Sequence, residues 1–343
     1  MRAVSRAAIA VLAAAALASC ASLGGREAGS SAEPPAALPA KGAILDVHDP
    51  SAALRCDGFY YLYSTGINIP ARRSRDLVDW EQLAPALSGP PIWAVLDIPS
   101  SDSIWAPDLS YRDGRYYLYY AISTFGSNTS DIGLATNATL DPRNPSYDWK
   151  DEGKVLESRE GDSWNAIDPN CVLDSEGRPW LAFGSFWGGI KLVRLDPATG
   201  KPEGEGARLY SIARRPDPPD AIEAPFISFR DGYYYLFASY DFCCRGADST
   251  YNIRVGRSSE ITGPYLDREG ISLLDGGGTK VAECAGRWRG PGGESVFRAA
   301  HGRWWIAYHS YDRDLAGTPT LRLSPLLWDR DGWPRPVTPI SGR

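Results

Sequence analysis

Three acidic residues hold the same position in an internal repeat of this chain. They are Asp49, Asp168 and Glu223, and each lies nine residues before a glycine that opens an aromatic segment. Each is followed by proline, either directly or after one alanine. A single Asp-Pro pair is a common turn sequence. Three carboxylates in register predict instead that separate repeats bring them to one place.

Converging carboxyl groups can perform glycoside hydrolysis. One carboxyl group must be protonated near neutral pH, so that it can donate to the leaving oxygen, and another must be ionised to activate water or attack carbon. A third carboxylate beside the acid would raise the pKa of that acid, because a neighbouring negative charge disfavours ionisation. The three residues therefore indicate a sugar-cleaving site.

The repeat that positions these acids has the pattern glycine-x-aromatic-aromatic-leucine and occurs five times. Its glycines are Gly58, Gly114, Gly177, Gly232 and Gly302. The residues nine positions earlier are Asp49, Trp105, Asp168, Glu223 and Gly293. Each glycine follows a turn-type or charged residue, which predicts a tight hairpin leading into a strand.

The length of the repeat predicts the fold. The five glycines lie 56, 63, 55 and 70 residues apart, and a repeat unit of this kind buries its hydrophobic face only against its neighbours. No stretch of the sequence has a sustained helical pattern. We therefore expect an all-β fold, a five-bladed β-propeller with four-stranded blades around a central channel. The acids would then open the strands nearest the axis.

Composition narrows the choice of partner. The chain has 12 Trp and 18 Tyr against one Met, and such aromatic side chains suit both strand packing and stacking on sugar rings. A net charge of −6 without any basic run argues against nucleic acid, whose phosphates require clustered Lys and Arg. We expect a polysaccharide or oligosaccharide ligand and a monomeric protein.

The N-terminus resembles that of an exported lipoprotein. Residues 1–19 have the arginines and apolar run of a signal peptide, and Leu17-Ala18-Ser19-Cys20 resembles a bacterial lipobox, which implies acylation of Cys20. Residues 20–43 predict a flexible tether and residues 44–343 the propeller. This lipid would be the only membrane contact, at the outer membrane or cell surface. The alternative is a plain secretory signal with a chance cysteine. Five further cysteines leave at least one thiol unpaired, and their pairing stays open.

The sequence around the acids resembles glycoside hydrolase family 43, and within it the arabinanases. The resemblance covers nearly the whole chain from residue 44 onward. The stretches around the acids are His48-Asp49-Pro50-Ser51, Trp105-Ala106-Pro107-Asp108, Asn165-Ala166-Ile167-Asp168-Pro169 and Ile222-Glu223-Ala224-Pro225. More specific are Phe125-Gly126-Ser127-Asn128, Gly184-Ser185-Phe186-Trp187, Asp241-Phe242-Cys243-Cys244-Arg245-Gly246 and Tyr308-His309-Ser310-Tyr311-Asp312.

The resemblance implies cleavage of α-1,5-linked arabinan with inversion, in the endo mode. Asp49 would be the general base and Glu223 the general acid, with Asp168 tuning and orienting Glu223. The residues implied to line the sugar subsites are His48, Trp105, Asn165, Ser185 and Trp187. The resemblance also implies a metal on the propeller axis, usually calcium, held largely through waters, with His309 as the matching imidazole.

The last repeat departs from the family pattern. Arabinanases commonly have Gly-Pro-Gly-His-Asn-Ser at this place, whereas this chain has Gly290-Pro291-Gly292-Gly293-Glu294-Ser295. An imidazole is missing and a carboxylate is added. This leaves the identity of the metal and the fine substrate preference open, while the three acids are intact.

Several alternatives stay open. Other members of the family act as β-xylosidases or exo-acting α-L-arabinofuranosidases, and loop geometry decides between an open groove and a blocked pocket. A glycan-binding propeller without turnover is a different class, but it has no need for three carboxylates that cost desolvation. A retaining propeller in which the residue at the place of Asp49 attacks directly is the rival mechanism.

The lipobox predicts that Cys20→Ala releases soluble, active protein from the membrane fraction, because the acylated thiol is the expected anchor. Fractionation of expressing cells measures this, with Cys56→Ala as a control that keeps the anchor. Unchanged membrane fractionation of the Cys20→Ala variant would contradict lipidation.

Overall fold

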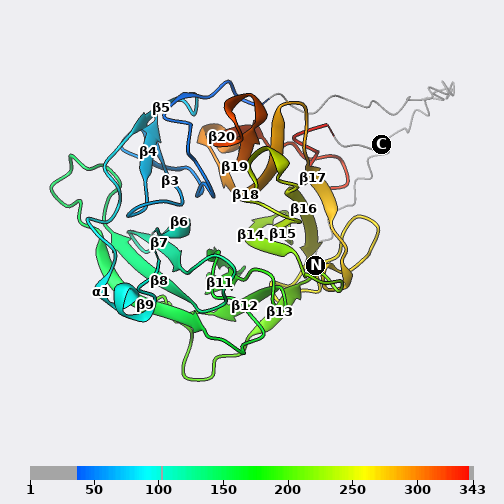
Figure 1. Ribbon diagram of the computed structural model, residues 1–343, viewed down its shortest axis with the longest axis horizontal. Helices are drawn as coiled ribbons and strands as arrows, with labels where there is room; N and C mark the ends of the chain where they lie inside the picture. Colours follow the sequence, from blue (N-terminus) through cyan, green and yellow to red (C-terminus); the bar gives the residue numbers. More distant parts are fainter. Residues whose placement is uncertain (1–36, 102, 340–343) are drawn as a thin grey trace, which may run out of the picture. The chain divides into compact units, whose positions relative to one another are not determined.

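The structure is a computed structural model, and it describes residues 37–101 and 103–339. The expected signal peptide, Cys20 and most of the tether lie outside the described residues. Within these residues five sheets follow one another along the chain and surround a common axis (Figure 1). This confirms the predicted five-bladed propeller. No helix in the described ranges is long and apolar enough to cross a lipid bilayer.

The sheets are numbered as blades one to five along the chain. Blade one contains β1 (Lys41–Gly42), β2 (Leu54–Cys56), β3 (Phe59–Tyr63), β4 (Ala71–Ser74) and β5 (Asp79–Gln82). Blade two contains β6 (Trp105–Arg112), β7 (Arg115–Ile122), β8 (Ser130–Asn137) and β9 (Lys150–Ser158). Blade three contains β10 (Asn170–Leu173), β11 (Pro179–Phe183), β12 (Ile190–Arg194) and β13 (Tyr210–Ala213).

Blade four contains β14 (Ile222–Arg230), β15 (Tyr233–Tyr240), β16 (Asn252–Ser258) and β17 (Thr279–Ala282). Blade five contains β18 (Trp288–Arg298), β19 (Trp304–Asp312) and β20 (Thr318–Pro325). The helices are short: α1 (Ile92–Asp97), η1 (Gly246–Asp248), η2 (Leu273–Asp275), η3 (Ala300–Gly302) and η4 (Arg313–Leu315).

The repeat glycines lie in the hairpins that join the two innermost strands of each blade. In blade one, Asp57 and Gly58 connect β2 to β3 and both have positive φ, 45° and 83°. Two-residue hairpins need this backbone because it follows the right-handed twist of the strands. The aromatic segment after each glycine forms the second strand, and all five residues of β3 are buried.

Hydrophobic side chains fill the spaces between neighbouring blades. Tyr61 of β3 and Leu118 of β7 belong to one buried cluster that joins blades one and two. Leu62 of β3 shares another cluster with Ile306 of β19 and Phe237 of β15, so that blades four, five and one pack together. The second strands therefore carry core side chains on both faces, which explains their continuous hydrophobic sequence.

The ring closes through the start of the chain. Blade five has three strands of its own, and the segment at residues 38–45 runs beside β20, where Leu38 N donates to Leu323 O at 2.8 Å and Leu321 N donates to Ile44 O at 2.8 Å. The same segment contains β1, which pairs in parallel with β5 of blade one. The first and last blades are thus joined by backbone hydrogen bonds.

Candidate active site

Each blade has a residue in the left-handed backbone region within or shortly before its innermost strand. These residues are Asp49 (φ 46°), Ala106 (39°), Asp168 (56°), Ala224 (52°) and Gly293 (57°). Residues other than glycine rarely adopt this conformation, and it is concentrated at functional sites. Its recurrence in all five blades shows that the centre of the propeller imposes it.

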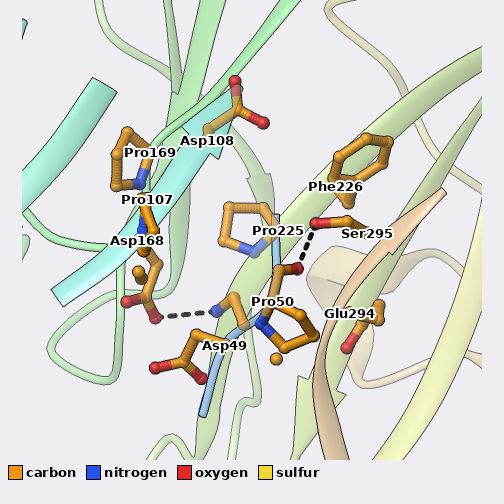
Figure 2. Close-up of a pocket in the computed structure, with 13 residues that line it drawn as sticks. Asp49, Pro50, Pro107, Asp108, Asp168, Pro169, Pro225, Phe226, Glu294 and Ser295 are labelled. Carbon is orange, nitrogen blue, oxygen red and sulfur yellow. Dashed lines mark hydrogen bonds between the residues drawn. The ribbon is translucent and has the colours of Figure 1, made fainter. Parts of the chain in front are cut away.

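Prolines follow these residues and line a small cavity on the axis. Pro50, Pro107, Pro169 and Pro225 surround a space of about 30 Å³ (Figure 2), which has room for one or two water molecules. Because proline has no N–H, these four positions present no unpaired backbone donor to the axis. Glu294 takes this place in blade five, and the hydroxyl of the next residue, Ser295, donates to the carbonyl oxygen of Pro50 at 2.8 Å.

A larger groove adjoins this axial cavity, because Asp49 and Asp168 line both. Its volume is about 600 Å³. The structure brings every residue that the sequence predicted for catalysis or sugar contact into its lining: His48, Asp49, Trp105, Asn165, Asp168, Ser185, Trp187 and Glu223. These residues come from four different blades or the loops beside them.

Asp49 is held in an environment that favours its ionised form. One carboxylate oxygen, Oδ2, lies 2.7 Å from His48 Nδ1 and accepts a hydrogen bond from the Thr65 hydroxyl at 2.7 Å. Burial alone would raise the pKa of Asp49, but the charge and hydrogen bond of His48, the nearby His309 and the Thr65 bond outweigh it and hold that pKa well below its usual range. The carboxylate is therefore ionised at neutral pH.

Glu223 has the opposite environment. Its side chain is buried, with Ser185 Oγ donating to Oε2 at 2.6 Å and the Tyr251 hydroxyl donating to Oε1. Burial raises the pKa of Glu223, the two hydrogen bonds lower it, and the charge of Asp49 raises it again, with a net upward shift. One groove thus holds two carboxyl groups whose pKa values are moved apart.

Asp168 connects blade three to the acid of blade four. Its Oδ2 accepts a hydrogen bond from the backbone N–H of Ala224 at 3.0 Å, next to Glu223 (Figure 2). Burial and then the charges of Glu223 and Asp49 raise the pKa of Asp168 well above its usual range. Asp168 can therefore act on Glu223 both through the backbone and through charge.

His309 and Glu294 place two unpaired polar atoms near the axis. His309 is fully buried, its Nδ1 accepts from the backbone N–H of Asp49 at 3.2 Å, and its Nε2 has no partner within the described part of the chain. Glu294 lines the axial cavity, with Oε2 accepting from Ser239 Oγ at 2.7 Å while Oε1 has no partner there. A carboxylate oxygen is the kind of ligand that calcium prefers, so Glu294 fits a cation. Nε2 of His309 carries the ring proton as long as Nδ1 accepts from Asp49, and it could ligate a metal only with that proton on Nδ1.

Gly293 explains the departure from the family pattern in physical terms. A Cβ atom added there would lie 2.3 Å from Asp49 Oδ1 and 2.9 Å from His309 Nδ1. A side chain at this position would require the Asp49 carboxylate and the His309 ring to shift, and the positive φ of 57° would add backbone strain. The arrangement of Asp49 and His309 seen here thus depends on glycine at this position.

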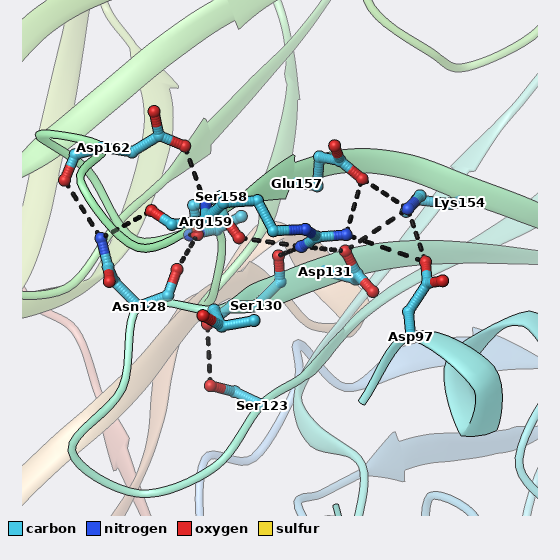
Figure 3. A network of polar contacts seen from close by, with 12 residues as sticks. Asp97, Ser123, Asn128, Ser130, Asp131, Lys154, Glu157, Ser158, Arg159 and Asp162 are labelled. Carbon is cyan, nitrogen blue, oxygen red and sulfur yellow. Dashed lines mark hydrogen bonds and ion pairs between the residues drawn. The ribbon is translucent and has the colours of Figure 1, made fainter. Parts of the chain in front are cut away.

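A network of polar contacts orients Asn165 at the groove. Ser130 Oγ donates to Asn165 Oδ1 at 2.6 Å, and the Asn128 side chain donates to three backbone carbonyls of residues 159–164 (Figure 3). Behind this loop the buried carboxylate of Asp131 pairs with Arg159 at 2.9 Å. The loop that presents Asn165 is thus fixed by blade two.

Sequence reasoning missed several residues of the site. Thr65 and Tyr251 bond directly to the two carboxyl groups, and nothing in the sequence distinguishes them from other threonines and tyrosines. The hydroxyl of Tyr311 lies 2.7 Å from His48 Nε2. A disulfide joins the adjacent residues Cys243 and Cys244 in the wall of the groove, while Cys56, Cys171 and Cys284 are free thiols.

Comparison with known proteins agrees with this geometry. Residues 43–334 match the family described as glycosyl hydrolases family 43. The chain belongs to this family. Among its relatives is an extracellular endo-α-(1→5)-L-arabinanase of Bacillus subtilis, 43% identical over 84% of this chain and 87% of the relative. An extracellular exo-α-(1→5)-L-arabinofuranosidase of Cellvibrio japonicus is 42% identical over 85% and 86%.

The family 43 assignment extends to the three-dimensional structure. An α-L-arabinanase of Cellvibrio cellulosa, solved in complex with arabinohexaose, superposes with a TM-score of 0.81 and 42% identity over 85% of this chain and 95% of that one. A family 43 endo-arabinanase of Bacillus licheniformis gives a TM-score of 0.80 at 44% identity, over 87% and 99%. This family 43 chain is therefore a glycoside hydrolase.

The geometry predicts a pH effect for Asp168→Asn. Glu223 is expected to work in its protonated form, so activity falls as pH rises through its pKa. Asp168 and Glu223 oppose one another's ionisation, as the upward effect of the Glu223 charge on the pKa of Asp168 shows. The neutral amide of Asp168→Asn should therefore lower the pKa of Glu223, and the basic limb of the kcat profile should move to lower pH. Asp168→Glu, which keeps the carboxyl group, is the matched control. An unmoved basic limb in Asp168→Asn would argue against this coupling.

Proposed function

We propose that this family 43 enzyme hydrolyses the α-1,5 linkages of arabinan with inversion, with Asp49 as general base and Glu223 as general acid. The observation that carries the proposal is the pair of opposite pKa shifts in one groove. Two carboxyl groups whose environments separate their pKa values in this way are suited to divide the roles of acid and base.

The proposed reaction follows from these protonation states. Glu223 donates its proton to the glycosidic oxygen as the bond to the anomeric carbon breaks. Asp49 removes a proton from a water molecule, whose oxygen forms the new bond from the opposite face of the sugar. Oδ2 of Asp49 already receives hydrogen bonds from His48 and Thr65, which leaves Oδ1 to take the proton.

Support for arabinan as the substrate comes from the relatives, whose names specify α-(1→5)-L-arabinan-cleaving enzymes of endo and exo type. Aromatic side chains in the groove suit sugar rings: Trp105, Trp187 and Phe125 line it, and 82% of Phe125 is exposed. We propose the endo mode, and exo release of arabinose is the alternative that the product pattern distinguishes.

Reducing-end release from linear arabinan tests the proposal. We expect a ladder of oligosaccharides from the wild-type enzyme, and at least an about 100-fold loss of kcat in Glu223→Gln and Asp49→Asn, since each removes one proton transfer. Glu260→Gln, an exposed carboxyl away from the groove, is the control and should keep full activity. A tenth of wild-type activity in either site variant would refute the assignment of that residue.

We also propose that the enzyme holds a cation, with calcium as the expected ion, near His309 and Glu294. The support is the buried Oε1 of Glu294 and the buried Nε2 of His309, neither of which has a partner among the described residues, since burying such groups unpaired is costly. His309 would ligate the cation through Nε2 only with its ring proton on Nδ1, where Asp49 Oδ1 lies 3.6 Å away. A bound cation supplies positive charge beside Asp49, which favours the ionised form of this carboxylate. Water molecules would complete the coordination.

Calcium binding can be measured without activity. After treatment with a chelator, added calcium should raise the unfolding temperature of the wild-type protein by a few degrees, because a ligand that binds only the folded state stabilises it. We expect Glu294→Gln and His309→Gln to weaken this response. If calcium gives neither a shift in unfolding temperature nor a binding heat in calorimetry, the proposed site does not hold this ion.

We further propose that the enzyme is exported and lipid-anchored through Cys20 at the outer membrane or cell surface. The extracellular relatives support export, and the lipobox-like sequence supports the anchor. The expectation that the enzyme is a monomer stays a prediction.

A further inference from the structure

Tyr311 lies behind the proposed base, in a chain of three hydrogen bonds. The backbone N–H of Cys244 donates to the Tyr311 hydroxyl at 2.8 Å. This hydroxyl lies 2.7 Å from His48 Nε2, and His48 Nδ1 lies 2.7 Å from Asp49 Oδ2. Tyr311 is 3% exposed, so water does not compete for its hydroxyl. These hydrogen bonds link the groove wall at the Cys243–Cys244 disulfide to the carboxylate of Asp49.

The directions of these bonds follow from the donors available. A backbone N–H can only donate, so the Tyr311 oxygen accepts from Cys244 and keeps its own single proton for another acceptor. The ionised carboxylate of Asp49 can only accept, so His48 Nδ1 must carry a proton. The Tyr311 hydroxyl can donate as well as accept, so it holds the other nitrogen, Nε2, whether or not that nitrogen carries a proton.

The ring of His48 is also fixed in orientation. It stacks on the ring of His309, with the two centroids 3.8 Å apart and an angle of 24° between the planes. Both nitrogens of His48 are used by protein groups, although the ring lines the groove. This arrangement suits an orienting role, in addition to any contact of the ring with sugar.

We propose that Tyr311 is a positioning residue that acts through His48: its bond to Nε2 holds the ring so that Nδ1–H donates to Asp49, which aims the free oxygen of Asp49 at the attacking water. A ring released from Tyr311 could turn and lose its bond to the carboxylate. The inference rests on the proposed role of Asp49 as the base.

Nitrogen NMR of the imidazole rings tests the bond from His48 to Asp49 independently of catalysis. The chain has three histidines, so ¹⁵N-histidine labelling of a protein without a histidine tag gives three imidazoles, and loss of one set in His48→Asn assigns His48. We expect a protonated Nδ1 at neutral pH and a change of the His48 signals in Tyr311→Phe. An unprotonated Nδ1 of His48 in the wild type would overturn the proposal.

Kinetics separate positioning from a structural role in the groove wall. Tyr311→Phe should lower kcat by about tenfold, the effect of one lost hydrogen bond, with KM unchanged. Tyr265→Phe removes a comparable buried bond, from its hydroxyl to Ile261 O at 2.8 Å in blade four, and should leave kcat unchanged. A raised KM with unchanged kcat in Tyr311→Phe would mean that Tyr311 only supports the wall near Cys244, and the proposal would be wrong.

A double-mutant cycle tests whether Tyr311 acts through His48. In His48→Asn the amide can still donate to Asp49 but offers no atom at the place of Nε2, so adding Tyr311→Phe should cause no further loss. A second tenfold loss in this background would contradict the proposal. If Asp49→Asn proves active while the NMR signals are as expected, the proposed base is wrong but the assigned proton on His48 Nδ1 stands.

Discussion

Carboxyl groups buried side by side around a narrow axis repel one another, and each loses its hydration. The rest of the site is arranged to offset this cost. Asp49, Asp168 and Glu294 all line the axial cavity, and Glu223 lies in the adjoining groove. Each of the four accepts a hydrogen bond from another residue. Asp49 accepts from the Thr65 hydroxyl and Asp168 from the backbone N–H of Ala224. Glu294 accepts from the Ser239 hydroxyl and Glu223 from the Ser185 hydroxyl.

The number and type of these donors set the protonation states. Asp49 has an imidazole beside it as well as a hydroxyl, and its pKa falls, whereas burial dominates at Glu223. At Glu294 burial outweighs the Ser239 bond and raises the pKa to about 8. The donors come from neighbouring blades, so these hydrogen bonds form only if the ring holds the blades in fixed positions. The bond from Ala224 joins blades three and four, and the bond from Ser295 to Pro50 joins blades five and one.

The sequence predicted the blades and the acids because both repeat with the chain. The hairpin glycines and the inner positions recur at nearly constant spacing, so the register of Asp49, Asp168 and Glu223 could be counted. Thr65 lies seven residues after Gly58, as His309 does after Gly302, but this register does not reveal its bond to Asp49. Tyr251 and Tyr311 could not be found by counting. Tyr311 lies 263 residues from His48 and Tyr251 lies 28 residues from Glu223, and no periodicity indicates such contacts.

Two further features required the structure for the same reason. The segment that runs beside β20 comes from residues 38–45, at the far end of the described chain, and the repeat gave no sign of this pairing. The tight space at Gly293 depends on Asp49 and His309, which belong to the first and last blades. The sequence shows that the imidazole is missing, but only the structure shows which side chains lie against this position.

The central claim is that Asp49 activates water rather than attacking carbon. Asp49 belongs to blade one and Glu223 to blade four, which are not neighbours in a ring of five, and this placement favours the wider separation of an inverting pair, about 6.5–9.5 Å. Proton NMR of the first sugar released from α-linked arabinan decides the point. The account predicts that the β-anomer is formed first and then mutarotates. Initial formation of the α-anomer would show that Asp49 is a nucleophile and would contradict the account.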